Sequence, residues 1–167
     1  AELERLPGCA GVKVFMGSST GSLLVADADG LRAVLKVIRR RASFHAEDEP
    51  RLNERKNLRI EGDARSHPVW RDEEAALKAT RRLVKIAHET GARVHVLHIT
   101  TAQEMEFLAG HKDVVSVEVT PHHLTLVAPE CYEKLGTYAQ MNPPLRDDRH
   151  RQAIWAGVAA GTVDVLG

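Results

Sequence analysis

Short apolar runs alternate along the chain with segments whose apolar residues recur at helical spacing. The apolar runs predict β-strands at residues 11–17, 42–45, 94–99, 114–120 and 163–166. The segments with helical spacing predict helices at residues 31–38, 72–90 and 101–108, and a fourth that begins at Asp147 or Asp148 and reaches residue 158. Residues 46–71 are polar and irregular and contain Pro50, Gly62 and Pro68, so we expect a long loop there.

Two of the predicted helices have recognisable capping residues. Asp72 is a predicted N-cap, and Gly91 follows the last turn of the same helix, where a glycine commonly ends a helix. Thr101 and Glu104 form the Thr-x-x-Glu pattern of a capping box. We therefore expect both helices to be bounded at these residues.

The alternation of strands and helices predicts an α/β fold with a parallel sheet. A doubly wound sheet and a (β/α)8 barrel both fit this order. We expect about five strands in the 167 residues, whereas a whole barrel has eight strands and about 250 residues. If the fold is a barrel, the chain therefore covers only part of it.

The composition is that of a soluble globular protein without a basic or acidic bias, because Lys plus Arg and Asp plus Glu number 23 each. This balance gives no reason to expect nucleic acid or an anionic membrane as a partner. Cys9 and Cys131 are too few for a disulfide framework, and no apolar stretch is long enough to span a membrane. We therefore expect a cytoplasmic protein. Nine histidines are many for this length and favour a metal site.

Three residues in or near the predicted strands are candidate metal ligands. His45 ends the second strand and His98 ends the third, and the active sites of parallel barrels lie at the C-terminal ends of strands. Neutral imidazole is a good zinc ligand, although a single such histidine is more often a hydrogen-bonded core residue. Lys13 lies within an apolar strand, where a charged amine is costly unless it is paired. Two interpretations of Lys13 stay open: an amine that reaches solvent at the strand end, and an amine that is carboxylated to give an anionic oxygen ligand.

The other histidines are interpreted as surface or structural residues. His122 and His123 follow the fourth strand, and because adjacent residues point in opposite directions, we expect one to be packed and the other exposed. The remaining five are His67, His88, His95, His111 and His150. Asn142 precedes two prolines that stiffen its loop, and its amide can donate and accept hydrogen bonds to a cyclic amide. A rigid turn before a helix explains the same residues.

Taken in order, these segments resemble the dihydroorotases of the amidohydrolase superfamily. Residues 11–21, Gly-Val-Lys-Val-Phe-Met-Gly-Ser-Ser-Thr-Gly, resemble the family's fourth barrel strand. Residues 44–49, Phe-His-Ala-Glu-Asp-Glu, and residues 95–101, His-Val-Leu-His-Ile-Thr-Thr, resemble the ends of the fifth and sixth. Residues 118–124, Glu-Val-Thr-Pro-His-His-Leu, and residues 141–146, Met-Asn-Pro-Pro-Leu-Arg, resemble the segments around the seventh. By this resemblance the chain covers about strands 4 to 8 of a parallel (β/α)8 TIM barrel.

The resemblance implies a zinc-dependent enzyme with two metal ions. It implies that Lys13, in carboxylated form, bridges the two zinc ions, that His45 and His98 bind one of them, and that Asn142 contacts the substrate ring. The implied reaction is the reversible hydrolysis of the cyclic amide of dihydroorotate to carbamoyl aspartate, a step of pyrimidine biosynthesis. The implied partners are this small-molecule substrate and either a second copy of the chain or another enzyme of the pathway.

The sequence also departs from the family pattern. It lacks the His-x-His motif of the first barrel strand and the Asp-His pair at the end of the eighth. Residues 163–167 resemble the beginning of that eighth strand, and Asp164 lies too early to be the catalytic aspartate. We expect this aspartate to lie beyond Gly167, so we assign no catalytic residue within the chain. We expect residues 1–167 to be a partial metal-dependent hydrolase barrel domain that is inactive alone.

Two alternative functions stay open. A hydantoinase or allantoinase would share the barrel and the lysine, but residues 142–146 and the Thr-Pro-His-His run favour a dihydroorotase. A non-catalytic dihydroorotase-like scaffold subunit is the other alternative. The joint presence of Lys13, His45 and His98 argues against it, since a scaffold does not need metal ligands.

Overall fold

The computed structural model of the chain describes residues 2–17 and 23–167. Its strands are β1 (Val12–Phe15), β2 (Ala42–His45), β3 (Val94–Val96), β4 (Val115–Val119) and β5 (Val165–Leu166). Its α-helices are α1 (Ala28–Val37), α2 (Glu49–Arg55), α3 (His67–Trp70), α4 (Glu73–Thr90), α5 (Ala102–Ala109), α6 (Pro121–Thr125), α7 (Glu130–Leu135) and α8 (Asp148–Ala159). Short 3₁₀ helices are η1 (Leu3–Arg5), η2 (Lys56–Leu58), η3 (Ala64–Ser66) and η4 (Gly136–Ala139). Residues 18–21, which end the first family motif, lie outside the described residues.

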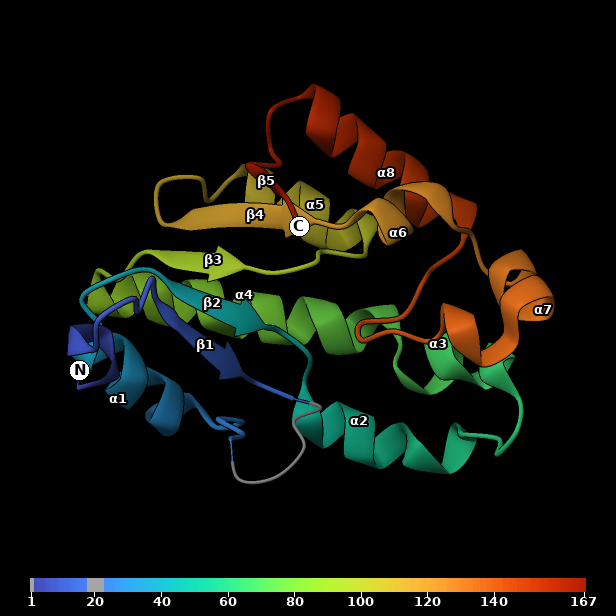
Figure 1. Cartoon of the computed structure of the whole chain (residues 1–167), viewed down its shortest axis with the longest axis horizontal. Helices are drawn as coiled ribbons and strands as arrows, with labels where there is room; N and C mark the ends of the chain where they lie inside the picture. Colours follow the sequence, from blue (N-terminus) through green and yellow to red (C-terminus); the bar gives the residue numbers. More distant parts are fainter. Residues whose placement is uncertain (1, 18–22) are drawn as a thin grey trace.

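The strands form one parallel sheet in the order β1-β2-β3-β4-β5, which is also their order along the chain (Figure 1). A doubly wound sheet contains a point at which the strand order reverses, whereas barrel strands follow one another without reversal. Helices α1, α4, α5 and α8 lie between successive strands, and each packs against the next. The predicted α/β fold of TIM-barrel type is therefore confirmed, and the described sheet is an arc of five strands.

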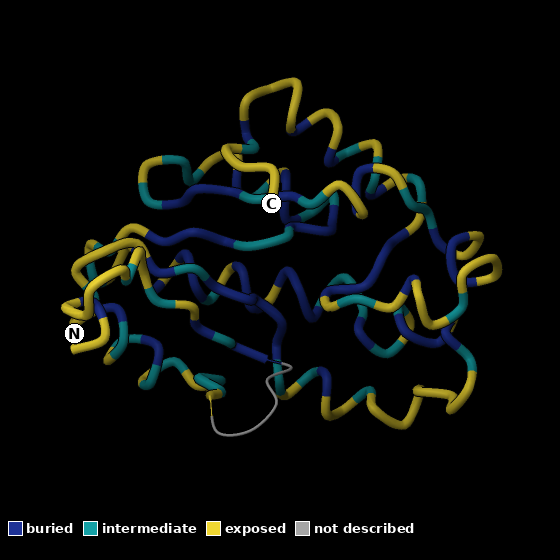
Figure 2. The backbone as a smooth tube through the Cα atoms, in the orientation of Figure 1, coloured by how far each residue is buried: buried dark blue, intermediate teal, exposed yellow. Residues whose placement is uncertain are grey.

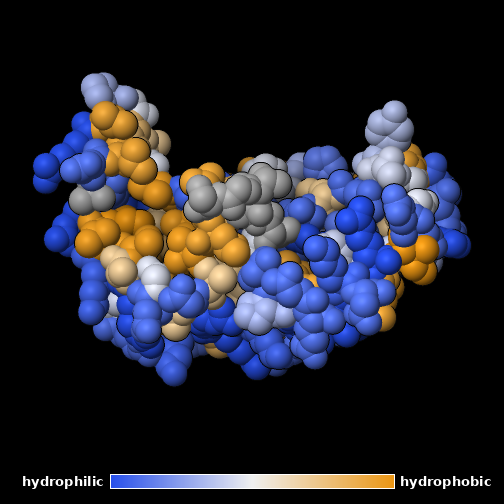
Figure 3. Space-filling model, turned by 90° about the horizontal axis from the view of Figure 1, so that it is seen from below, coloured by the Kyte–Doolittle hydropathy of each residue, from blue (hydrophilic) through white to orange (hydrophobic). Residues whose placement is uncertain are grey.

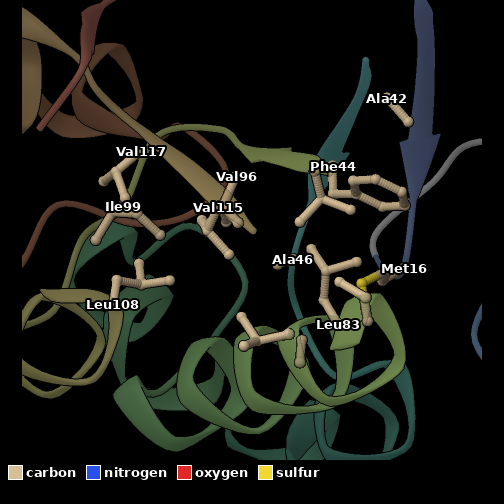
Figure 4. Close-up of a cluster of buried hydrophobic side chains, with 14 of the residues drawn as sticks. Met16, Ala42, Phe44, Ala46, Leu83, Val96, Ile99, Leu108, Val115 and Val117 are labelled. Atoms are coloured by element: carbon tan, nitrogen blue, oxygen red, sulfur yellow. The ribbon is translucent and has the colours of Figure 1, made fainter. Parts of the chain in front are cut away.

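The hydrophobic core lies between the sheet and these helices. Val14, Phe44, Val96 and Val117 occupy equivalent positions on neighbouring strands, and all four are buried. Leu83 of α4 is buried in the same cluster (Figure 4). Burying one such side chain contributes about 1.5–3 kcal/mol. Figure 2 shows that the buried positions gather along the strands and that the loops at the outer ends are exposed.

The opposite face of the sheet carries a row of polar residues. Lys13, Ser43, His95 and Ser116 are paired in register across β1 to β4. His95 Nδ1 lies 2.8 Å from Ser116 Oγ, and His95 Nε2 lies 3.2 Å from Glu118 Oε2. Because this face is the interior of a barrel, His95 has the structural role that the sequence predicted for it.

The observed helix ends agree with the capping residues in the sequence. The side chain of Asp72 accepts a hydrogen bond from Ala75 N at the start of α4, and Gly91 ends that helix with a φ of 68°. At α5, Thr101 Oγ1 accepts a hydrogen bond from Glu104 N and donates one to Glu104 Oε2 at 2.8 Å. Both predicted caps are confirmed.

The loop expected at residues 46–71 is wrong, because this segment contains α2, η2, η3 and α3. The Asp48 side chain caps α2 by accepting a hydrogen bond from Arg51 N. Pro50 lies in the first turn, where the missing N–H of proline has no helical partner to lose. Pro50, which suggested a loop, therefore marks the start of a helix together with the capping Asp48.

Apolar side chains are exposed beside β1, which is an edge strand of the described sheet. Figure 3 shows them gathered mainly over the N-terminal segment and α1, whereas the surface over α2 is mostly hydrophilic. The exposed large apolar residues of this part of the chain are Leu3, Leu6, Leu23 and Val37. An open strand edge of this kind can pair with a further strand. Across the described residues, no helix has the length and apolar character needed to cross a membrane.

Candidate metal centre

Two imidazole rings meet beyond the C-terminal ends of neighbouring strands. His45 is the last residue of β2, and His98 follows β3 by two residues. His45 Nδ1 lies 3.1 Å from His98 Nε2, and the ring centroids are 4.8 Å apart in an edge-to-face arrangement. The structure thus brings together two of the three candidate metal ligands.

A buried carboxylate determines which nitrogen of His45 is available. Glu47 is fully buried, and its Oε2 lies 2.7 Å from His45 Nε2. Arg71 donates to both oxygens of this carboxylate, from Nε at 3.1 Å and from Nη2. An ionised carboxylate only accepts hydrogen bonds, so His45 carries its proton on Nε2 and directs the lone pair of Nδ1 toward His98. Burial raises the pKa of Glu47, but the hydrogen bond from His45 and the charge of Arg71 outweigh it and lower the pKa to about 2.

His98 is held in a conformation that costs free energy. Its φ of 41° is positive, which is found at no other described residue except glycines. Such a conformation costs about 1–3 kcal/mol, and residues that adopt it cluster at functional sites. Burial, with the charges of His45, His123 and Lys13, lowers the pKa of His98 to about 3. His98 is therefore a neutral imidazole at physiological pH, which is the form that binds metals.

The histidine pair fits a zinc ion. Zinc–nitrogen bonds of about 2.0–2.1 Å in a tetrahedral arrangement place two ligand nitrogens about 3.3 Å apart. The separation of 3.1 Å is close to this value. The carboxylate behind His45 has the position of the carboxylates that orient many metal-bound histidines. His98 Nδ1 is buried without a hydrogen-bond partner among the described residues. This second ring nitrogen can therefore bind a further polar group.

Lys13 lies on the face of the sheet that leads to the histidine pair. It is paired in register with Ser43, two residues before His45. Its Nζ lies 4.8 Å from the centre of the Phe15 ring, and that ring lies 5.7 Å from the ring of His45. Since β1 is an edge strand, the Lys13 side chain is exposed, as one of the two interpretations of the sequence expected. The carboxylated form stays a prediction.

The loop that carries Asn142 is connected to the site through His123. His123 is buried and its Nε2 lies 3.1 Å from the carbonyl oxygen of Pro143, whereas His122 is exposed. The prediction that one of these two histidines is packed and the other exposed is confirmed. Asn142 is exposed, and the carbonyl oxygen of the preceding residue, Met141, lies 3.0 Å from His67 Nε2. Its contact with a substrate stays a prediction.

The last strand carries an aspartate whose carboxylate is engaged in structural contacts. Asp164 directly precedes β5, so it lies at the N-terminal end of that strand, whereas His45 and His98 lie at C-terminal ends. Its Oδ2 accepts a hydrogen bond from Val117 N at 2.7 Å and one from the amine of Lys112. At the other end of β5, Gly167 N donates to the carbonyl oxygen of Val119 at 2.9 Å. Asp164 therefore has a structural role, and a catalytic aspartate beyond Gly167 stays a prediction.

The groups that support His45 are not among the residues predicted from the sequence. Glu47 follows His45 by two residues, and side chains at i and i+2 of an extended chain point to the same side, so the sequence contained this signal. Arg71 follows α3, inside the segment expected to be a loop, and no local pattern indicates it. Gly17 also belongs here, because a Cβ at this position would overlap the backbone carbonyl of Glu47. The support of the site is therefore built from three separate segments.

The chain is similar to known proteins along nearly its whole length. No protein-family model matches it. The chain is 35% identical over 159 residues to a dihydroorotase of Halobacterium salinarum, covering 92% of this chain and 36% of that protein. It is 32% identical, over an alignment of 178 positions, to a dihydroorotase of Methanosarcina mazei, covering 99% of this chain and 39% of that protein. The structure superposes on the dihydropyrimidinase from Brevibacillus agri NCHU1002 with a TM-score of 0.88 and 25% identity, covering 99% of this chain and 38% of that one.

The chain spans less than two fifths of the length of these relatives. The relatives are cyclic amidohydrolases, and the structural neighbours have the TIM-barrel architecture. The strand order, the helices between the strands and the histidine pair at the strand ends agree with that architecture. The chain is therefore identified as a fragment of the amidohydrolase family, similar in sequence to dihydroorotases and in structure to a dihydropyrimidinase.

Proposed function

We propose that the protein containing this chain is a zinc-dependent dihydroorotase, which reversibly hydrolyses the cyclic amide of dihydroorotate to carbamoyl aspartate in pyrimidine biosynthesis. The observation that carries the proposal is the approach of His45 Nδ1 and His98 Nε2 to 3.1 Å, with Glu47 behind His45. The identity of 35% with a dihydroorotase supports dihydroorotate as the substrate among the cyclic amides. Association with a second copy or with another enzyme of the pathway, and a cytoplasmic location, stay predictions.

The metal-binding groups in this proposal are His45, His98 and a carboxylated Lys13. The protonated amine of Lys13 first loses one proton, and the neutral amine then joins carbon dioxide through a new N–C bond and releases a second proton. A cation is thereby converted into an anionic oxygen donor. Bound zinc supplies a water of lowered pKa and polarises the amide carbonyl of the substrate. We assign two zinc ions to the whole enzyme, following the resemblance of the sequence to its family.

The surrounding residues position these ligands and the substrate. Glu47 and Arg71 hold the proton of His45 on Nε2 and so keep Nδ1 directed toward the metal. His98 is neutral over the whole physiological pH range, because its pKa is about 3. Asn142 is exposed on its loop, and its amide would pair with the N–H and C=O groups of the substrate ring.

Substrate preference of the intact protein, supplied with zinc, tests the proposed reaction. We expect kcat/KM to be higher for dihydroorotate than for hydantoin or allantoin. A preference for either of the other two substrates would overturn the assignment. The variants H45A and H98A should lose bound zinc as well as activity, and metal analysis separates the two effects. Loss of activity with zinc retained would show that these histidines are not ligands.

A hydantoinase is the second candidate, and one observation favours it. The solved structures that resemble the chain are hydantoinases and dihydropyrimidinases. The dihydropyrimidinase from Brevibacillus agri NCHU1002 is 25% identical to the chain, which is lower than the 35% of the dihydroorotase, and a shared fold does not select a substrate. The prediction that residues 1–167 form a partial domain that is inactive alone stays a prediction in either case.

A further inference from the structure

We propose that the molecule has a separate surface site for a transition metal ion, formed by His88, His111 and Asp113. One ligand atom of each residue lies within 4.8 Å of the others. His88 is in the last turn of α4, before β3, and the other two residues lie between α5 and β4. They therefore precede the N-terminal ends of strands, whereas the proposed catalytic histidines follow the C-terminal ends. The site does not depend on the proposed dihydroorotase reaction.

The spacing of the two imidazole rings suits a shared metal ion. His88 Nε2 lies 3.2 Å from His111 Nδ1, which is close to the distance of about 3.3 Å between two nitrogens on one tetrahedral zinc ion. The rings are edge-to-face with centroids 5.3 Å apart, so the ring edges that carry the nitrogens approach each other. The two nitrogens can share one proton in a hydrogen bond, and a metal ion would take the place of that proton.

A carboxylate completes the set of donors. Asp113 Oδ2 lies 3.8 Å from His88 Nδ1, and the side chains of Asp113 and His88 are 66% and 41% exposed. Asp113 therefore faces the ring nitrogen of His88 that does not face His111. Because one ligand atom from each of the three residues lies within 4.8 Å of the others, rotation of these exposed side chains can bring three donors to one ion. Two imidazoles and one carboxylate suit zinc, nickel or copper, whereas magnesium and calcium prefer sites made of oxygen atoms.

The two histidines are anchored by the secondary structure on which they lie. The ring of His111 packs on the ring of Phe107, with centroids 4.4 Å apart. The backbone carbonyl of His111 accepts a hydrogen bond from Val115 N at 3.0 Å, which ties it to the start of β4. The backbone carbonyl of His88 accepts a hydrogen bond from Gly91 N at the end of α4. The backbone positions of both histidines are therefore set by the packing of two helices and a strand, and Phe107 also holds the ring of His111.

The charges of neighbouring cations are engaged elsewhere. Lys112, between His111 and Asp113 in the sequence, directs its amine to the carboxylate of Asp164 and to the carbonyl of Thr162 at 2.7 Å. An ion at the proposed site would join the end of α4 to the turn before β4. We expect it to stabilise the protein without contacting the substrate.

Zinc titration of the intact protein tests this site. Protein that already holds its tightly bound zinc is dialysed and titrated with Zn²⁺ by calorimetry, with Mg²⁺ as the control ion. We expect wild type to bind one more zinc ion per chain than the H88A/H111A variant, and Mg²⁺ to bind to neither. The variant H122A, which removes an exposed histidine outside the cluster, should bind as many ions as wild type.

Two further variants make the outcome specific. D113N keeps both rings and should weaken binding of the additional ion, and H88Q serves if the double variant folds poorly. The variant H45A/H98A should retain the additional ion, so failure of the proposed catalytic site and failure of this one give different results. Equal zinc stoichiometry in wild type and in folded H88A/H111A or H88Q would overturn the proposal.

Discussion

Replacing Glu47 by Gln should destabilise the protein by about 3–5 kcal/mol and weaken its metal binding, because it removes one partner of a buried ion pair. The same replacement of Glu104 should cost much less stability and should leave metal binding unchanged. Both side chains are buried, with exposed fractions of 0% for Glu47 and 2% for Glu104. Glu47 contacts Arg71 and His45, whereas Glu104 accepts hydrogen bonds from two threonine hydroxyl groups, at 2.7 and 2.8 Å. The two carboxyl groups are matched in burial and differ in charge environment.

The magnitude follows from the partners of each carboxyl group. The pKa of Glu47 falls from 4.5 to about 2, and at about 1.4 kcal/mol per pH unit this difference corresponds to roughly 3 kcal/mol. Because the folded-state pKa is the lower one, this stability is fully present above pH 4.5 and is lost as the pH falls toward 2. At neutral pH, E47Q leaves Arg71, whose side chain is 4% exposed, without its buried partner. Burial raises the pKa of Glu104, so a neutral amide there should cost about 1 kcal/mol or less.

Urea denaturation of the metal-free protein at pH 7 measures the free energies of unfolding, and zinc titration measures the affinity. E47Q should weaken zinc binding by about 10- to 100-fold, because Glu47 orients His45. E104Q should leave it unchanged. Adding R71M to E47Q should recover part of the stability, since the unpaired charge is then removed. Equal losses of stability in E47Q and E104Q, or an unchanged zinc affinity in E47Q, would refute this reasoning.

Burial lowers the pKa of His123 from 6.5 to about 4, so the unfolded chain binds a proton between these pH values and the folded chain does not. Stability should therefore fall by about 3 kcal/mol as the pH is lowered through this window, and urea denaturation at pH 7 and pH 4.5 should show a smaller decline for H123Q. G17A places a Cβ against the Glu47 carbonyl and should cost about 1–3 kcal/mol, with weaker zinc binding in the same titration; wild-type zinc affinity would show that this contact does not position the site. T101A removes the N-cap of α5 and should cost about 1 kcal/mol while zinc affinity stays unchanged, and a change in affinity would show that this cap also positions His98.

The sequence was sufficient for the sheet and for the histidine pair because both depend on regular rules. Strands that end in His45 and precede His98 place these residues together once the sheet is parallel, since the carboxyl ends of parallel strands lie at one edge. The side-chain contacts made by Arg71, and the contact of His88 with His111, do not follow from these rules. The contact of Arg71 with Glu47 joins residues 24 apart, and the contact of His88 with His111 joins residues 23 apart. Both are fixed by how separate helices pack, which no local pattern encodes.

Lys13 belongs to a row of polar residues that can be recognised only when four strands are compared in register. Each has one polar residue between apolar neighbours: Val12-Lys13-Val14, Ala42-Ser43-Phe44, Val94-His95-Val96 and Val115-Ser116-Val117. In a single strand this pattern does not fix which face is buried, because a slip of one residue moves every side chain to the other face. In the observed register the polar residues form one row, and their neighbours form the core against the helices. Lys13 therefore lies on the polar face of the sheet, and because it is exposed at the edge strand its amine avoids the cost that its apolar strand suggested.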